Sequence, residues 1–315
     1  MEIFRGLQDV PESDAPTFLA LGMFDGVHLG HRAVLAATVA AARTGAGRSL
    51  ALTFDPHPQR IIAPPPEPIL LTTVEERVEF FAGLDLDAAV IVRFDETLRR
   101  TPAGHWMEML AAVVRQGSVL VSSTYTFGQD RGGTVEVLRA GGARLGFGVT
   151  VVPPVHVEGA LVSSTLIRRL LRSGAVEEAG RFLGRLYTVR GRVVEGERRG
   201  RVLGFPTANL AVHPDKVLPG RGIYAAWGRL EGGIHAAAVS VGTRPTFGPG
   251  ALLVEAHLLD FDADLYGQDI ELVFVSRVRD EVAFRTVPEL VAQMESDVSA
   301  IRRFLAPRGG LGPDS

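Results

Sequence analysis

The chain has 315 residues, of which 46% are hydrophobic and 22% charged, and its formal net charge is -3. This composition is ordinary for a globular protein long enough to form two cores, and it gives no reason to expect nucleic acid or a membrane as partner. No apolar run approaches the roughly 20 residues that span a bilayer. The absence of cysteine excludes disulfides and suits a cytoplasmic protein. Lys216 is the only lysine and no Walker A loop surrounds it, so other groups must hold any phosphate.

The first half alternates between short apolar runs and segments with helical spacing. A capping box at Thr73 and Glu76 marks one helix start. This alternation predicts a parallel sheet with helices on both faces and a ligand site at the carboxyl ends of the strands. Strands are expected at 18–21, 49–54, 88–92, 118–122 and 147–152, and helices at 33–44, 74–84, 104–114 and 135–140.

The most informative motif, G-M-F-D-G-V-H-L-G-H at residues 22–31, follows the first of these strands. A strand, a glycine-bearing turn and a helix start form an anion site, because the first helical N–H groups carry partial positive charge. Gly26 and Gly30 let backbone approach a ligand closely. His28 and His31 share one face of the opening turn, where both can donate to phosphate oxygens. The alternative is a pair of ordinary surface histidines at a helix start.

After residue 152 the pattern changes to two short helices followed by strands separated by glycine and proline turns. Close spacing of short strands predicts a small barrel or sandwich. A capping sequence at 286–289 opens a closing helix whose apolar face carries Leu290, Met294, Val298, Ile301 and Leu305. The boundary is expected near Gly184, and residues 308–315 are expected to be a disordered tail. The helices are expected at 163–171 and 176–183, and the strands at 189–194, 222–230, 235–241, 252–259 and 270–274.

Both halves resemble known enzyme families. The motif at 22–31 resembles the nucleotidyltransferase H-x-G-H signature in the form found in bacterial FAD synthetases, and this likeness extends over residues 18–183. Residues 185–305 resemble riboflavin kinases. The motifs that carry the second likeness are G-R-V-L-G-F-P-T-A-N-L at 200–210, G-I-Y-A at 222–225, V-G-T-R-P-T-F at 241–247 and E-A-H-L-L-D-F at 255–261.

The chain as a whole therefore resembles the bifunctional riboflavin kinase/FAD synthetase family. The resemblance implies an α/β Rossmann-like nucleotidyltransferase domain at 1–183, joined to a small antiparallel six-stranded β-barrel with a C-terminal helix at 184–307. It implies that riboflavin is phosphorylated to FMN with ATP and Mg²⁺, and that FMN is adenylylated with ATP to FAD and pyrophosphate. The pattern specifies no oligomeric state. The alternatives are a riboflavin kinase with a weakened or non-catalytic first half, and a non-catalytic flavin carrier.

For the kinase, Thr207 and Asn209 offer neutral oxygens two residues apart, which point the same way on extended backbone. The resemblance implies that they bind Mg²⁺ and ATP phosphates, and that Glu255 is the base for the riboflavin 5′-hydroxyl. The alternatives are a self-capping turn and a solvent-facing glutamate. Further nucleotide or flavin contacts are expected at Gly204, Phe205 and Pro206, and glycines that let loops close at Gly200, Gly204 and Gly222.

For adenylyl transfer, the resemblance implies catalytic roles for His28, His31 and Arg168. Arg168 belongs to the S-S-T-L-I-R stretch at 163–168, a second helix N-terminus suited to the outgoing pyrophosphate. His57 belongs to F-D-P-H-P at 54–58, which resembles a family element near the flavin and nucleotide; a rigid proline turn is the alternative. The cofactor-binding residues implied for this half are Gly22, Phe24, Asp25, Gly26, His57, Ser164 and Thr165.

Three residues depart from the family pattern. Ser122 replaces a glycine, Thr124 replaces an acidic or amide residue, and Ser240 replaces an asparagine. The change at Thr124 removes a hydrogen-bond acceptor near the expected ATP site. These departures bear more on the FAD synthetase activity than on the kinase activity.

Overall fold

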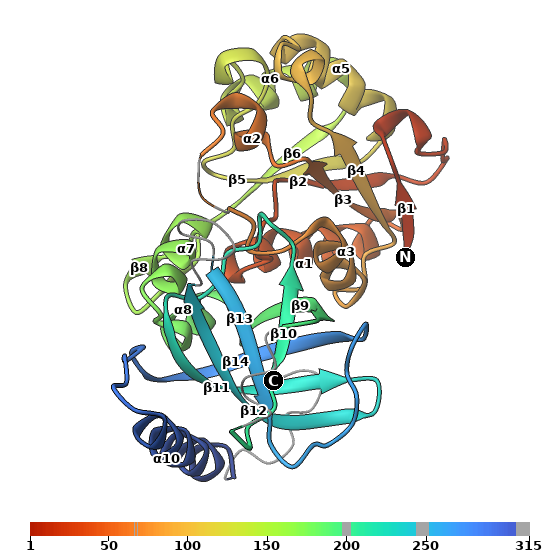
Figure 1. The fold of residues 1–315 in the computed structure, drawn as a ribbon. Coiled ribbons are helices and arrows are strands. Elements are labelled where there is room, and N and C mark those ends of the chain that lie inside the picture. Colours follow the sequence, from red (N-terminus) through yellow and green to blue (C-terminus); the bar gives the residue numbers. More distant parts are fainter. Residues whose placement is uncertain (66, 68, 197–202, 244–251, 307–315) are drawn as a thin grey trace. The chain divides into compact units, whose positions relative to one another are not determined.

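The computed structural model describes residues 1–65, 67, 69–196, 203–243 and 252–306 (Figure 1). The chain divides into two compact units, Met1–Ser164 and Thr165–Ser315. Each unit has its own sheet and its own core.

The first unit is built on a parallel sheet with the strand order β1-β4-β3-β2-β5-β6. The order reverses between β2 and β5, so the turn after β2 opens at the position where ligands bind in sheets of this kind. The strands are β1 (Glu2–Phe4), β2 (Thr17–Leu21), β3 (Arg48–Asp55), β4 (Ala88–Arg93), β5 (Ser118–Ser122), β6 (Gly148–Val152), and the hairpin β7 (His156–Val157) and β8 (Ala160–Leu161). The helices are α1 (Leu29–Thr44), α2 (Pro58–Ile62), α3 (Val74–Ala82), α4 (Glu96–Arg99), α5 (Ala103–Val113) and α6 (Val135–Leu145), with 3-10 turns at Leu7–Asp9 and Gln129–Arg131.

The central strands are apolar along their length because helices cover both faces of the sheet. On one face, Leu35 of α1 and Phe81 of α3 join a buried cluster with Phe24. On the other face, Leu110 of α5 and Leu138 of α6 belong to a second cluster. Figure 1 shows the two pairs of helices on opposite sides of the sheet. This arrangement confirms the predicted parallel sheet with helices on both faces.

The helix α6 extends beyond the predicted end at residue 140, through Gly141 and Gly142 to Leu145. A Cβ at Gly141 would lie 2.2 Å from Met107 Sδ, and one at Gly142 would lie 2.7 Å from the Phe147 carbonyl oxygen. These glycines therefore serve close packing and do not end the helix. The short elements β1, α2, α4, β7 and β8 were not predicted.

The second unit contains a closed antiparallel barrel in the order β10-β13-β12-β11-β14-β9, which confirms the six-stranded barrel among the described residues. The strand β10 follows a glycine- and proline-rich stretch and was missed. The strands are β9 (Tyr187–Val194), β10 (Ala208–Val212), β11 (Gly222–Leu230), β12 (Gly233–Thr243), β13 (Leu252–Leu258) and β14 (Asp269–Arg279), and the helices are α7 (Ser164–Arg172), α8 (Val176–Leu183) and α10 (Val287–Leu305).

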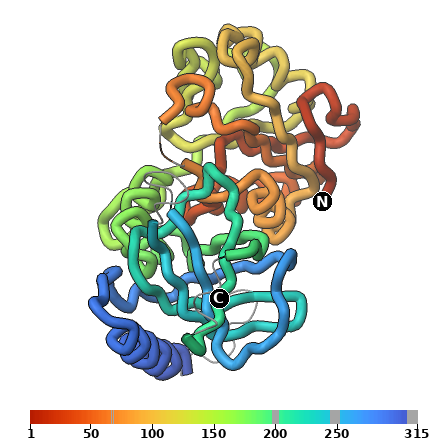
Figure 2. Tube along the Cα trace, in the orientation of Figure 1, coloured from red at the N-terminus to blue at the C-terminus, as the bar shows by residue number. Residues whose placement is uncertain are grey.

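The helix α10 lies along the outside of the barrel, where its Ile301 and Leu305 are buried with Ala225 and Val275 (Figure 2). The short helix α8 packs against β14 and β9. Its Glu177 accepts hydrogen bonds from the Ser276 hydroxyl and from the backbone N–H of Arg277. The units divide after Ser164, the first residue of α7, whereas the sequence places the boundary after α8, near Gly184.

The single lysine of the chain lies inside the second unit. Lys216 is 3% exposed, and its ammonium nitrogen lies 5.1 Å from the ring centroid of Tyr187. The Tyr187 hydroxyl donates to the Val217 carbonyl at 2.6 Å, which fixes the chain on either side of this contact.

Candidate active sites

The first site lies at the turn between β2 and α1, where His28 is the N-cap of the helix. Its Nδ1 accepts a hydrogen bond from the backbone N–H of His31 at 3.2 Å. Because Nδ1 is an acceptor, a neutral His28 ring carries its proton on Nε2, which is then a donor. The two imidazole rings are stacked with centroids 3.5 Å apart. The structure therefore brings the two predicted histidines together at a helix N-terminus, where the dipole favours an anion.

The backbone of this turn adopts conformations that are rare for residues with side chains. Phe24 has a φ of 51°, Val27 of 38° and Gly26 of 90°. For Phe24 and Val27 such backbone costs about 1–3 kcal/mol each, and it persists only where surrounding contacts hold it. Gly22 at the entrance leaves room for the Phe24 ring, because a Cβ there would lie 3.0 Å from the ring, tighter than an ordinary contact.

Asp25 and Ser164 hold this turn from two sides. The buried Asp25 carboxylate accepts hydrogen bonds from the backbone N–H groups of Leu71 and Thr72 at 2.9 Å and 3.0 Å. The backbone N–H of Gly26 donates to Thr72 Oγ1 at 2.9 Å. The Ser164 hydroxyl donates to the Asp25 carbonyl at 2.9 Å. Ser164 thus lies at the predicted phosphate turn, and the Asp25 side chain accepts hydrogen bonds from the loop before α3.

The other residues predicted for adenylyl transfer are placed on helix starts. His57 caps α2, and its Nδ1 accepts from the Gln59 N–H at 3.1 Å at the carboxyl end of β3. Thr165 is exposed and Arg168 half-buried in the first two turns of α7, within the second unit. Ser122 and Thr124 lie at the end of β5, with their hydroxyl oxygens 3.4 Å apart.

An aromatic cavity of about 490 Å³ lies in the same unit, and the sequence reasoning missed it. Tyr125 and Phe127 are stacked with centroids 5.7 Å apart, and Phe54 lies 6.1 Å from Trp106. Burial raises the pKa of Tyr125 above its ordinary value, so its hydroxyl stays protonated. Aromatic residues are only 7% of the chain, so their recurrence just after strands was an available signal. The lining aromatic residues are Phe54, Phe94, Trp106, Tyr125 and Phe127.

The second site is a row of residues across five strands of the barrel. Glu255 of β13 pairs with Asn209 of β10 on one side and with Ser240 of β12 on the other. Ser240 pairs with Ile223 of β11, which pairs with Arg279 of β14. Directly opposed residues on antiparallel strands share one face of the sheet. The structure therefore brings the predicted Asn209 and Glu255 side by side.

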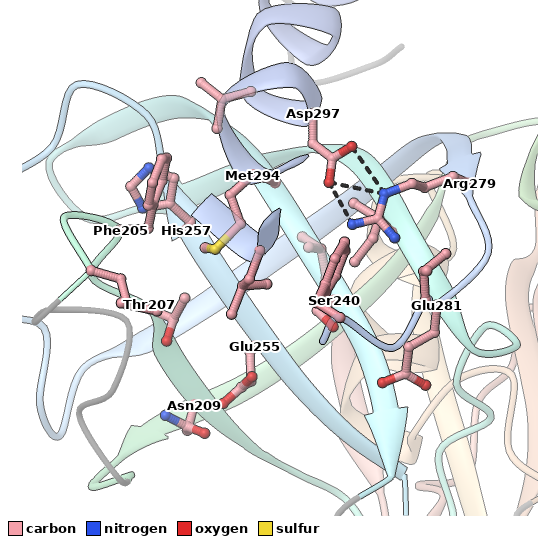
Figure 3. Close-up of a pocket in the computed structure, with 18 residues that line it drawn as sticks. Phe205, Thr207, Asn209, Ser240, Glu255, His257, Arg279, Glu281, Met294 and Asp297 are labelled. Atoms are coloured by element: carbon pink, nitrogen blue, oxygen red, sulfur yellow. Dashed lines mark hydrogen bonds and ion pairs between the residues drawn. The ribbon is translucent and has the colours of Figure 1, made fainter. Parts of the chain in front are cut away.

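This row faces away from the barrel interior and toward α10. In β13, Val254, Ala256 and Leu258 are buried inside the barrel, while Glu255 and His257 alternate with them on the other face. A cavity of about 330 Å³ lies on that face (Figure 3). Besides the row, its lining includes Phe205 and Thr207, three residues of the segment after β14 (Glu281, Val282 and Phe284), and Leu290, Met294, Asp297 and Val298 of α10.

An ion pair at one side of this cavity joins α10 to β14. Arg279 Nε and Nη2 donate to the carboxylate of Asp297 at 3.0 Å and 2.7 Å, as the dashed lines in Figure 3 show. Asp297 is 7% exposed, and its Oδ1 also accepts from Gln293 Nε2 at 2.8 Å. Sequence reasoning missed this pair. The signal was available, because Asp297 stands between Met294 and Ile301 on the apolar face of the closing helix.

The other end of the cavity carries the predicted magnesium and nucleotide residues. Thr207 precedes β10, and Asn209 lies within it at 7% exposure. A Cβ at Gly196 would lie 2.1 Å from Asn209 Nδ2, so the glycine leaves the room that this amide occupies. The described residues contain no group of three or more histidine or acidic side chains placed to hold a metal ion. Two neutral oxygens are a suitable partial ligand set for Mg²⁺ when substrate phosphates supply the rest.

The loop before Thr207 is anchored to β13. His257 Nδ1 donates to the Pro206 carbonyl at 2.8 Å, and the Phe205 ring packs edge-on against His257 at 5.5 Å. Gly204 has a φ of 84°, a conformation that glycine adopts without strain. The predictions for Gly200, for the motif positions 244–247 and for the tail 308–315 lie outside the described residues.

Comparisons with known proteins match each half of the chain to a family. A family model described as FAD synthetase matches residues 10–166, and one described as riboflavin kinase matches residues 183–305. A "Bifunctional riboflavin kinase/FMN adenylyltransferase" of Listeria monocytogenes is 35% identical over 93% of this chain and 94% of its own length. The protein of the same name in Escherichia coli K12 is 33% identical over 96% of this chain and 98% of its own length.

A solved structure is also similar over nearly the whole chain. It is titled a macrolide-efflux protein from Streptococcus pneumoniae, and it matches with a TM-score of 0.85 and 29% identity over 95% of this chain and 98% of its own. In the part of this chain that the structure describes, no helix combines the length and apolarity needed to cross a membrane.

Proposed function

This chain belongs to the family of bifunctional riboflavin kinase/FMN adenylyltransferases, and from that premise we propose which residues perform each reaction. The barrel unit phosphorylates riboflavin to FMN, and the first unit transfers AMP from ATP to FMN. We assign residues 1–183 to the adenylyltransferase and 184–307 to the kinase, and we place the enzyme in the cytoplasm, where ATP is available.

In the kinase reaction, Glu255 takes the proton of the riboflavin 5′-hydroxyl while that oxygen attacks the γ-phosphorus of ATP, and ADP leaves. The observation that carries this assignment is the pairing of Glu255 with Asn209 across β13 and β10. It sets a carboxylate beside the residue proposed to hold the phosphates, as in-line transfer requires. The cavity between the barrel and α10 is the proposed place of the flavin ring.

Magnesium is proposed to bind at Thr207 and Asn209, whose oxygens would share it with the phosphates of ATP. When bound, it neutralises charge that develops on the transferred phosphoryl group. Thr207 and Asn209 are then proposed to position the phosphate end of the nucleotide, and Gly196 leaves the room that the Asn209 amide occupies.

In adenylyl transfer, a phosphate oxygen of FMN attacks the α-phosphorus of ATP, and the bond to the β-phosphate breaks to release pyrophosphate. No covalent intermediate with the protein is needed, so the site must align two anions and stabilise the growing charge. His28, His31 and the start of α1 are proposed to do so at the α- and β-phosphates. Thr165 and Arg168 are proposed to hold the outgoing pyrophosphate. The aromatic cavity beside Phe54 and Trp106 is the proposed place of the FMN ring.

The deciding experiment incubates the purified chain with riboflavin, ATP and Mg²⁺ and separates FMN from FAD over time. We expect FMN to appear first and FAD to follow from it. FMN without detectable FAD at saturating ATP would favour the alternative, a riboflavin kinase with an inactive first unit, and bound riboflavin with no product would indicate a carrier.

A magnesium titration tests the proposed metal contacts in the same assay. Asn209→Ala should need more Mg²⁺ for half-maximal FMN formation, because one of two protein oxygens is lost. An unaltered titration would remove Asn209 from the metal site. Ser163→Ala, in the stretch before α7, is the matched control and should leave the kinase titration unchanged.

A further inference from the structure

A buried arginine outside the two proposed sites contacts the phosphate turn. Arg77 lies in α3, one turn after the Thr73 capping box, and is 1% exposed. Buried arginines are rare because removing the charge from water is costly. Burial lowers the pKa of Arg77, while the negative charges of Asp25 and Asp55 oppose that shift, and an arginine remains protonated near neutral pH.

The contacts of Arg77 reach both proposed substrate sites. Its Nη1 donates to the carbonyl of Met23 at 3.1 Å, within the phosphate turn. The same nitrogen donates to the carbonyl of Phe54 at 3.2 Å, in the wall of the aromatic cavity. Thr53 completes the link, because its hydroxyl accepts from Arg77 at 2.6 Å and donates to the Met23 carbonyl at 2.7 Å. One guanidinium group thus joins the end of β2 to the end of β3.

The same helix supports the turn at two further points. Phe81, one turn after Arg77, packs edge-on against Phe24 with centroids 5.7 Å apart, and Phe24 packs edge-on against His31 at 5.4 Å. Asp25 is held by the backbone N–H groups just before α3. Three consecutive residues of the turn, 23 to 25, are therefore each fixed by α3 or by its lead-in.

These contacts explain why the charged Arg77 side chain occupies a buried position where an apolar side chain would stabilise the fold equally well. Replacing a buried charge with a well-packed apolar residue is often neutral or stabilising. An apolar side chain could not, however, donate to carbonyl groups of two separate strands. The turn also contains Phe24 and Val27 at positive φ, which only outside contacts can hold.

We propose that Arg77 is a positioning residue for adenylyl transfer, which sets the phosphate turn at a fixed distance from the aromatic cavity. This inference rests on the proposed roles of His28, His31 and the cavity. In-line attack requires the FMN phosphate and the α-phosphorus of ATP to be aligned closely, and a displacement of about 1 Å can cost about 10²-fold in rate. Arg77 acts through the backbone of Met23 and Phe54 and has no contact with reacting atoms in this assignment.

The test compares Arg77→Met and Arg77→Lys with the wild-type chain at full length. We expect Arg77→Met to lower kcat for FAD formation by about 10- to 100-fold per folded molecule. The KM values for FMN and ATP should change much less, and FMN formation by the barrel unit should be unchanged. The kcat of Arg77→Lys for FAD formation should lie between those of wild type and Arg77→Met. Its ammonium group keeps the positive charge but lacks the planar, multidentate donor arrangement of a guanidinium group.

A control and a second measurement separate positioning from folding. Arg43→Met removes an exposed arginine of α1 that pairs with Asp85 at 3.2 Å, and it should leave both reactions unchanged. Thermal unfolding gives the folded fraction by which each rate is divided. Wild-type kcat in folded Arg77→Met, or in Arg77→Lys if the first variant does not fold, would overturn the proposal. Absence of FAD formation by the wild type would instead remove the proposed adenylyltransferase function.

Discussion

In the first unit the residues proposed to bind phosphate are neighbours along the chain, whereas in the barrel they are neighbours only across strands. The turn of 22–31 carries His28 and His31 on one continuous segment, held in rare backbone conformations. The barrel row takes Asn209, Glu255 and Ser240 from three strands in ordinary extended conformation. The first site therefore depends on local backbone geometry, and the second depends on strand register.

The largest expected effect tests the barrel row. Glu255→Gln keeps the shape of the side chain and removes the proposed base, so kcat for FMN formation should fall by about 10²- to 10⁴-fold. FAD formation from supplied FMN should continue, because the first unit is unaltered. Steady-state rates with each flavin measure both effects. Glu295→Gln, an exposed change on α10, is the matched control, and normal turnover in Glu255→Gln would exclude Glu255 as the base.

The converse test removes a donor from the phosphate turn. His31→Ala should lower FAD formation by about 10²- to 10³-fold, the usual cost of losing one donor to a charged transition state. FMN formation from riboflavin should stay at the wild-type rate. His105→Ala, an exposed histidine on α5 of the same unit, controls for loss of an imidazole. Equal losses in both reactions would contradict the separation of the two sites.

A third test asks which segments the barrel needs for folding. A fragment of residues 165–306 keeps α7 and α8, whereas one of residues 184–306 exposes the barrel surface that Val176, Phe182 and Leu183 cover. Burying one such side chain contributes about 1.5–3 kcal/mol, so the shorter fragment should lose about 3 kcal/mol or more of its free energy of unfolding. Urea unfolding of both fragments measures the difference. Equal stabilities would place the folding boundary at Gly184, as the sequence suggests.

The smallest effect is expected at the departures from the family pattern. Restoring glycine and a carboxylate with Ser122→Gly and Thr124→Asp should raise FAD synthesis by about three- to tenfold, the value of one hydrogen bond of 0.5–1.5 kcal/mol. The proposed anion-binding turn and its helix start match the family motif, so we expect these two positions to affect ATP placement only. The KM for ATP is the quantity to measure. A change in kcat for FMN formation in this double variant would contradict the assignment to the first unit.

The comparison also explains which parts of the molecule the sequence could predict. The fold class followed from alternating patterns, and His28 and His31 could be identified because one segment carries the whole motif. Asn209 and Glu255 could be identified one at a time, but their pairing depends on register, which the sequence leaves open. Arg77 could not be found, because a charged residue after a capping box is usually at the surface.

The aromatic cavity and the Arg279–Asp297 ion pair were missed for a similar reason. The aromatic cavity gathers single residues from the ends of different strands and from α5, so no segment contains a pattern. The Arg279–Asp297 pair joins a strand end to a helix. Asp297 on the apolar face of α10 indicates a buried partner, but which residue that partner is follows only from the position of α10 on the barrel. Sites that form between separate helices and strands can be identified only when the three-dimensional arrangement of those elements is known.

The single buried lysine provides a chemical probe for transient opening of the barrel unit. Lys216 is the only side chain that an acylating reagent for amines can modify, and burial protects it in the closed barrel unit. Its modification rate therefore measures how often that unit opens, without any engineered probe. A ligand that binds the closed barrel should slow the reaction in proportion to its occupancy. The binding of riboflavin and of ATP could thus be compared by how much each ligand slows acylation of Lys216, in an assay that needs no catalytic turnover.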